Sequence, residues 1–172
     1  VIDARLSGYV STISNKMNLV ASHRKLVDRI EACLSKVAPN SQPPPIQLLG
    51  KSVEDQKNIA DHIASRYAMR AFLLPIDFLP QAFQELNDFI RLWSREALLH
   101  QHILFIEASA LEEYEKSKIA LIQRSLEHIQ GVVIISTFYQ FTHMDRTIEM
   151  ISVERPTREE QEDLWKTELG DV

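Results

Sequence analysis

The sequence lacks several features that would by themselves assign it to a class of protein. It has one cysteine, Cys33, among 172 residues, which excludes an internal disulfide framework and is typical of a reducing compartment such as the cytosol. Its longest apolar runs, such as residues 132–135, are far shorter than the roughly 20 residues that a membrane-spanning helix needs. We therefore expect a cytoplasmic protein without a membrane partner.

An excess of basic charge is also missing. The chain has 19 Lys and Arg residues against 24 Asp and Glu residues, its formal net charge is −5, and no block of like charges stands out. This balance does not resemble the basic surface of a nucleic-acid binder, so DNA or RNA is not expected as a direct partner. His100 and His102 are close in sequence, but no third ligand completes a site beside them, so no metal is expected.

The first 38 residues contain no proline, and their apolar residues recur at steps of three, four and seven. This spacing predicts an amphipathic helix, or a pair of helices, over residues 1–38. The apolar stripe would pack on the rest of the domain or, as the alternative, bind a partner helix. Residues 39–45, PNSQPPP, break any helix and are the expected linker. The stripe consists of Leu6, Val10, Ile13, Met17, Val20, Val27, Ile30, Leu34 and Val37.

Residues 46–172 alternate apolar runs with helical patterns, and we expect them to form one domain. The runs lack polar alternation, and a helix follows each of them except one, which is typical of a parallel sheet covered on both faces, that is, a three-layer α/β fold. Pro75 implies an edge position or a bulge. The expected strands are residues 46–50, 71–78, 102–108, 131–138 and 147–154, and the expected helices are residues 55–68, 81–101, 112–130 and 156–169.

From residue 44 onward, the order of these segments resembles an AAA+ ATPase module. The family's phosphate-binding pattern, Walker A, follows the first strand and reads G-P-P-G-x-G-K-T-x-L-A, whereas residues 50–60 read G-K-S-V-E-D-Q-K-N-I-A. The frame is kept at Gly50, Ile59 and Ala60. The resemblance implies a parallel sheet of the P-loop NTPase type, with residue 50 at the start of the former phosphate loop.

The residues that bind phosphate and magnesium in the family are replaced. Gln56 stands in the place of the phosphate-binding lysine, Lys57 in that of the magnesium-binding hydroxyl, and Asp55 in that of a loop glycine. Glutamine brings no charge, a protonated lysine has no lone pair for Mg²⁺, and a carboxylate would repel polyphosphate. A shift by one residue would put Lys57 in the lysine position, but the loop would still lack every glycine except Gly50.

The later motifs show matching losses. In the segment that resembles Walker B, Glu107 stands for the Mg²⁺-orienting aspartate and Ala108 for the glutamate that polarises the attacking water. Tyr139 stands for the polar asparagine at the end of the next strand. Alanine cannot accept a proton, so hydrolysis by the usual route is not expected. We expect Glu107 to form an ion pair with Lys57 or Lys51 across the vacated site, within about 4 Å.

Arg146 belongs to a short segment, MDRTI at residues 144–148, that resembles the box carrying an arginine for a neighbouring subunit's nucleotide site. The alternative is a local pair with Asp145 or Glu149. Residues 156–172 resemble the opening of the helix that leads into the family's helical lid, and we expect the lid itself to be missing.

The resemblance and its losses predict a catalytically inactive AAA+ module without a bound cofactor, in a structural, oligomerising or regulatory role. The alternative is a module that binds ATP and Mg²⁺ and hydrolyses slowly through Lys57 or Lys51. The expected partner is a neighbouring AAA+ module or subunit, or a second copy of the chain. Two short runs, residues 95–99 and 160–165, resemble a bacterial branch that joins a glycine-poor module to a complete one, so we expect the amino-terminal half of a longer bacterial protein.

Overall fold

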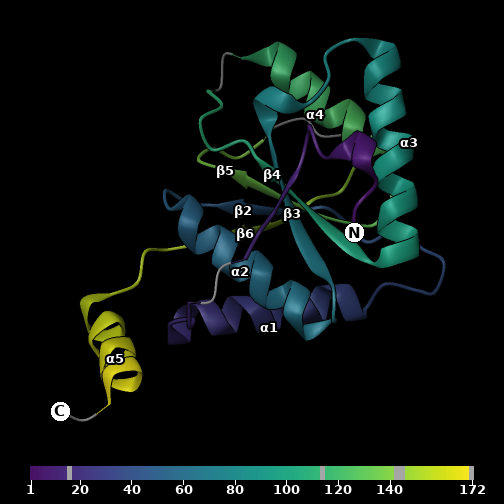
Figure 1. Cartoon of the computed structure of the whole chain (residues 1–172). Helices are drawn as coiled ribbons and strands as arrows, with labels where there is room; N and C mark the ends of the chain where they lie inside the picture. Colours follow the sequence, from purple (N-terminus) through teal and green to yellow (C-terminus); the bar gives the residue numbers. More distant parts are fainter. Residues whose placement is uncertain (15–16, 113–114, 142–145, 171–172) are drawn as a thin grey trace.

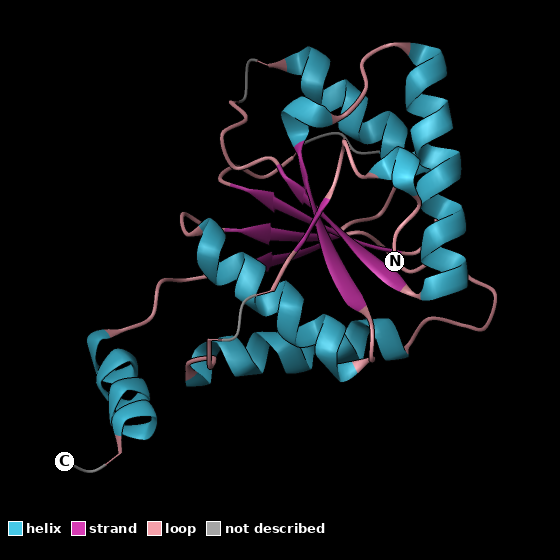
Figure 2. Ribbon diagram, in the orientation of Figure 1, coloured by secondary structure: helices cyan, strands magenta, loops and turns pink. Residues whose placement is uncertain are grey.

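A twisted sheet of six strands, in the order β1-β3-β4-β5-β2-β6, forms the centre of the protein (Figures 1 and 2). The structure is a computed structural model that describes residues 1–14, 17–112, 115–141 and 146–170. Strands β2 to β6 run parallel, whereas β1 pairs with β3 in the antiparallel sense. The strands are β1 (Ser11–Thr12), β2 (Ile46–Leu49), β3 (Arg70–Pro75), β4 (His102–Glu107), β5 (Val132–Thr137) and β6 (Glu149–Ser152).

Helices cover both faces of this sheet. The helices are α1 (Ala21–Ser35), α2 (Val53–Arg66), α3 (Phe83–His100), α4 (Lys116–His128) and α5 (Arg158–Leu169). Strand β4 shows the two layers, because Leu104 and Ile106 pack with α3 and α4 whereas Ile103 and Phe105 pack with α1 and α2. A strand buried on both sides reads as a continuous apolar run. The predicted three-layer α/β fold with a parallel sheet is confirmed.

The amino-terminal segment differs from its prediction. A helix or helix pair was expected over residues 1–38, but the α-helix is confined to Ala21–Ser35, preceded by a short 3₁₀ turn, Ala4–Leu6, and by β1. Leu6 is buried on the α3–α4 side, whereas Val27 is buried on the α1–α2 side. The stripe is therefore shared between two layers, and at Ser11–Thr12 the backbone pairs with β3 instead of forming a helix.

Most other boundaries shift by a few residues. The strand expected over residues 71–78 ends at Pro75 and passes into a 3₁₀ turn, Ile76–Phe78. Pro75 lies beyond Phe72 and Leu73, the two residues that pair with β1, so it occupies the expected edge position. The helix expected from residue 112 is seen from Lys116, and residues 113–114 lie outside the described part of the chain.

Helix α5 stands apart from the three layers (Figure 1). None of its residues is buried, and both Trp165 and Leu169 are largely exposed. In the described ranges, no helix combines the length and the apolar character needed to cross a bilayer.

Candidate functional site

The carboxyl ends of β2, β4 and β5 lie side by side, at the edge where ligands bind in parallel α/β sheets. In the ladder, Leu49 of β2 pairs with Thr137 of β5, and Glu107 of β4 pairs with Ser136 of β5. Helix α2 starts a few residues after β2 and packs over β3, β4 and β5. The fold thus brings together the residues that the resemblance places at a nucleotide site.

Gln56 connects two of these elements. Its side chain is fully buried, and its Nε2 donates a hydrogen bond of 3.2 Å to the Gly50 carbonyl oxygen. Its Oε1 accepts a short hydrogen bond from the Ser136 hydroxyl, which is also buried. Both ends of the amide are therefore used inside the protein, at the place where the resemblance puts a phosphate-binding lysine.

The turn after β2 packs directly against backbone. A Cβ atom on Gly50 would lie 2.4 Å from the Val153 carbonyl oxygen and 3.2 Å from Gln56 Nε2. The Gly50 N–H donates to the Thr137 carbonyl over 3.1 Å, and the Val153 N–H donates to the Leu49 carbonyl over 2.7 Å. Glycine is thus required here because another chain segment approaches closely.

The amino terminus of α2 is neutralised by the chain itself. Ser52 is the N-cap, and its hydroxyl accepts a hydrogen bond of 3.3 Å from the Asp55 N–H. Glu54 and Asp55 add two carboxylates to the first turn, where negative charge stabilises the helix dipole. A phosphate would meet these carboxylates, so the usual anion site of a helix amino terminus is disfavoured.

Lys57 and Glu107 form an ion pair between α2 and the end of β4. Lys57 Nζ lies 3.3 Å from Glu107 Oε2 and 3.5 Å from Glu54 Oε1. The expected pair between Glu107 and one of the two lysines is therefore confirmed for Lys57, whereas Lys51 is exposed. The side chains of Lys57 and Glu107 are both partly buried, so each charge is matched by the other where solvent is reduced.

The end of β4 offers no second carboxylate. Ala108 is fully buried, and its N–H donates to the Ser136 carbonyl over 2.9 Å. Tyr139 is half-exposed, and its carbonyl accepts a hydrogen bond of 3.0 Å from Gln47 Nε2. The same nitrogen donates to the Thr137 hydroxyl over 2.7 Å.

The sequence reasoning missed Gln47, but it included Ser136, because residues 136–139 end an apolar strand at the edge where parallel sheets bind ligands. Both are buried polar residues inside otherwise apolar strands, and each makes hydrogen bonds to a segment distant in sequence. A single polar residue within an apolar strand was the available signal, because a buried polar side chain needs a partner.

Arg146 is held within the chain. Its guanidinium donates to the carbonyl oxygens of Leu126, over 2.5 Å, and of Pro43, over 2.7 Å. Burial lowers the pKa of the Arg146 guanidinium from its usual value. Glu149, which the sequence offers as a local partner for Arg146, forms an ion pair with Arg29 over 3.4 Å. Met144 and Asp145, which belong to the same box, lie outside the described residues.

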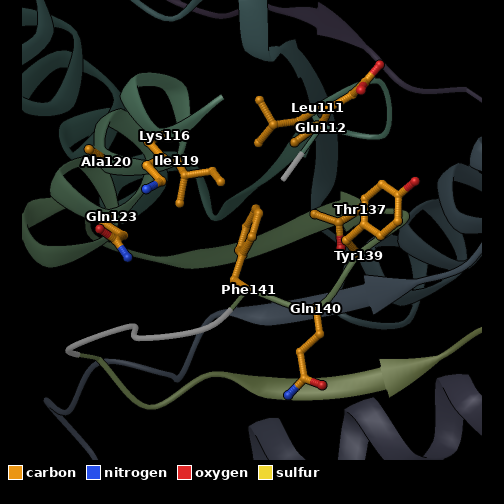
Figure 3. Close-up of a pocket in the computed structure, with 11 residues that line it drawn as sticks. Leu111, Glu112, Lys116, Ile119, Ala120, Gln123, Thr137, Tyr139, Gln140 and Phe141 are labelled. Atoms are coloured by element: carbon orange, nitrogen blue, oxygen red, sulfur yellow. The ribbon is translucent and has the colours of Figure 1, made fainter. Parts of the chain in front are cut away.

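Two hollows flank these residues. One, of about 480 Å³, lies beyond the ends of β4 and β5. Figure 3 shows Phe141 in this hollow, between Ile119 and Thr137. Gly50, Gln56 and Lys57 do not line it. The other, of about 470 Å³, adjoins the turn after β2. The second hollow is lined by Lys51, Ser52, Val53, Glu54, Asp55, Arg155, Pro156 and Gln161.

The two histidines noted in the sequence lie close together at the end of α3. The rings of His100 and His102 stack with centroids 5.7 Å apart, and His100 Nε2 lies 3.9 Å from Glu96 Oε2. Burial and the neighbouring His100 lower the pKa of His102. Over the residues that the structure describes, no group of three His, Cys, Asp or Glu side chains could hold a metal ion.

Comparison with known proteins gives a likeness in fold. No protein-family model and no curated protein matches the sequence. The solved structure of Rhizobiales Trip13 is similar with a TM-score of 0.52 and 20% identity, over 94% of this chain and 74% of that chain. The structure of C. elegans PCH-2 is similar with a TM-score of 0.52 and 11% identity, over 93% of this chain and 51% of that chain.

A third structure, the E. coli MS115-1 HORMA:CdnC:Trip13 complex, has a TM-score of 0.49 and 13% identity, over 99% of this chain and 77% of that chain, which is too weak to support an argument. At the identities of the first two structures, the likeness concerns the fold alone. The chain shares the fold of the Trip13 and PCH-2 structures.

Proposed function

We propose that this chain is a module of AAA+-like fold that does not hydrolyse ATP and that serves a structural, oligomerising or regulatory role beside an active ATPase module. The position of Gln56 carries the proposal. Its buried amide bonds to the Gly50 carbonyl and to the Ser136 hydroxyl. To contact a phosphate, Gln56 would have to break both hydrogen bonds and leave buried polar groups unpaired.

The end of β4 supports the same proposal. Glu107 is engaged by Lys57, and the next residue, Ala108, has no group that could accept a proton from water. A positively charged Lys57 beside Glu107 also competes with a divalent cation for the same carboxylate. These features leave the usual route of hydrolysis without its base and without its metal ligand.

We propose a neighbouring AAA+ module, or a second copy of this chain, as the partner. The fold shared with Trip13 and PCH-2 supports a module of this type, and the chain spans only 51% of the PCH-2 structure. The resemblance assigns Arg146 to a neighbour's nucleotide site, but the guanidinium would have to release two carbonyl oxygens to reach it, which supports a structural role. A position in the amino-terminal half of a longer bacterial protein stays a prediction.

Nucleotide binding without efficient hydrolysis is the second candidate function. The hollow beside the turn after β2 favours it, because Lys51 and Arg155 both line that hollow and could face phosphate groups. Glu54 and Asp55 line the same hollow and oppose an anion there. The balance of these charges favours the first proposal.

Isothermal titration calorimetry of the whole chain with Mg·ATP separates the two candidates. The first proposal predicts no saturable heat with ATP up to about 1 mM, the range of weak binding sites. The variants Lys51→Met and Lys36→Met form a matched pair, since both lysines are exposed and only Lys51 lines the hollow. Saturable binding that Lys51→Met abolishes and Lys36→Met preserves would replace the first proposal with the second. If ATP binds saturably and neither variant changes its affinity, both proposals are wrong, because ATP then binds outside the hollow that Lys51 lines.

A further inference from the structure

The amino terminus of α1 lacks a cap of its own. Its N-cap residue is Val20, which offers no side-chain acceptor, and the first turn of the helix contains no acidic residue. The first N–H groups of a helix have no partner within the helix, so they need an acceptor from elsewhere. The Ser22 N–H is one of these groups.

A carboxylate from α5 supplies that acceptor. Glu160 Oε1 accepts a hydrogen bond of 2.8 Å from the Ser22 N–H, although the two residues are 138 positions apart. A negative charge at this place also stabilises the dipole of α1. A hydrogen bond with the Ser22 side chain is the main reason why the pKa of Glu160 is lowered from its usual value, and the bonds from the Thr157 and Ser22 N–H groups lower it further.

The same carboxylate closes the capping box of its own helix. Glu160 Oε2 accepts a hydrogen bond of 3.1 Å from the Thr157 N–H, and the Glu160 N–H donates to the Thr157 hydroxyl over 3.2 Å. One oxygen therefore serves α1 and the other serves α5. The contact with α1 can break while the capping box of α5 remains intact.

Little else holds α5 against the rest of the protein. None of its residues is buried, and a hollow of about 340 Å³ lies between α5 and the start of α1. Asn18 donates to Glu168 over 3.3 Å, on the exposed side of this contact. Just before α5, a His23 ring nitrogen lies 2.8 Å from the Glu154 carbonyl oxygen, so the connection is anchored up to that residue.

We propose that Glu160 is a latch that docks α5 against the amino terminus of α1, and that α5 swings as an intact helix about residues 155–157 when the bond to Ser22 is lost. Leu164 of α5 is only half-buried where it lines the hollow with Leu19 and Val20, so the apolar contact is small and the hydrogen bond to the Glu160 carboxylate sets the position of α5. The latch joins the start of α1, the first α-helix, to α5, the last helix of the described residues.

Distance measurement between two spin labels tests the latch. The labels are attached at Lys25→Cys and Lys166→Cys, both exposed, in a Cys33→Ser background, and the distances are measured by double electron–electron resonance. We expect one narrow distribution for the unmodified latch and a broad one for Glu160→Ala. Glu159→Ala is the matched control, because Glu159 carries the same charge in the same turn and is exposed. It should keep the narrow distribution.

A second variant distinguishes movement of α5 as an intact helix from unfolding of α5. Thr157→Ala removes one hydrogen bond of the capping box and leaves the bond between Ser22 and Glu160, so the distribution should stay narrow. Hydrogen exchange of the Ser22 amide should speed up about fivefold to tenfold in Glu160→Ala, the equivalent of a lost cap, while amides late in α5 keep their protection. A narrow distribution in Glu160→Ala, a broad one in the unmodified protein, or equal broadening by Thr157→Ala would overturn the proposal.

Discussion

Replacing Gln56 by methionine should destabilise the protein more than any other change of one polar side chain at the site. Methionine keeps the length of the side chain but removes both hydrogen bonds, so the Gly50 carbonyl and the Ser136 hydroxyl lose their partner. A buried polar group left unsatisfied costs about 1–3 kcal/mol. Ser136 is fully buried, whereas Gly50 is half-buried and can be partly hydrated. We therefore expect a loss of about 2–4 kcal/mol in the free energy of unfolding.

Urea unfolding followed by circular dichroism measures this loss. With a denaturant slope of about 2 kcal/mol per M, the midpoint should fall by about 1–2 M. Gln84→Met is the control, because Gln84 is exposed on α3 and its hydrogen bond to Asp88 is 3.5 Å long. The control should change stability by less than about 0.5 kcal/mol. If Gln56→Met also lowers the free energy of unfolding by less than about 0.5 kcal/mol, Gln56 is not a structural link between these elements.

Three further predictions concern the neighbours of Gln56. Gly50→Ala should lower the free energy of unfolding by more than about 2 kcal/mol, because its Cβ would lie 2.4 Å from a backbone oxygen. Gly8→Ala, where the added Cβ meets no atom within 4 Å, should be nearly neutral in the same thermal unfolding experiment. A double-mutant cycle of Lys57→Met and Glu107→Gln should give a coupling of about 0.5–1 kcal/mol that shrinks in 1 M NaCl, and a coupling independent of salt would contradict an ion pair. Arg146→Met should destabilise the chain by about 1–3 kcal/mol, and a neutral effect on urea unfolding would remove its structural role.

The parallel sheet could be predicted because its strands carry their signal locally. Residues 103–106 and 133–135 are apolar without alternation, and they are buried on both faces. The amino-terminal segment could not be predicted in the same way. Leu6 and Val27 have helical spacing with their neighbours, but they belong to different layers of the core. Periodicity records which residues are buried, not against which element they are buried.

Those parts of the candidate site that follow from the position of a residue within one sequence motif could be predicted. Counting from Gly50 placed Gln56 in the former lysine position, and comparison with the next strand motif placed Glu107 near Lys57, which the ion pair confirms. The bond from Gln56 to Ser136 joins residues 80 positions apart, so no local pattern could show it. The inward position of Arg146 also depends on distant segments, since its two acceptors come from the linker and from α4.

A crystal structure of the protein grown with Mg²⁺ and a non-hydrolysable ATP analogue would test the central claim most directly. The account predicts that Gln56 stays bonded to the Gly50 carbonyl and to the Ser136 hydroxyl, that Lys57 stays paired with Glu107, and that no phosphate density appears at the turn after β2. Density for a triphosphate along residues 50–55, with the Gln56 amide turned away from Ser136, would contradict it.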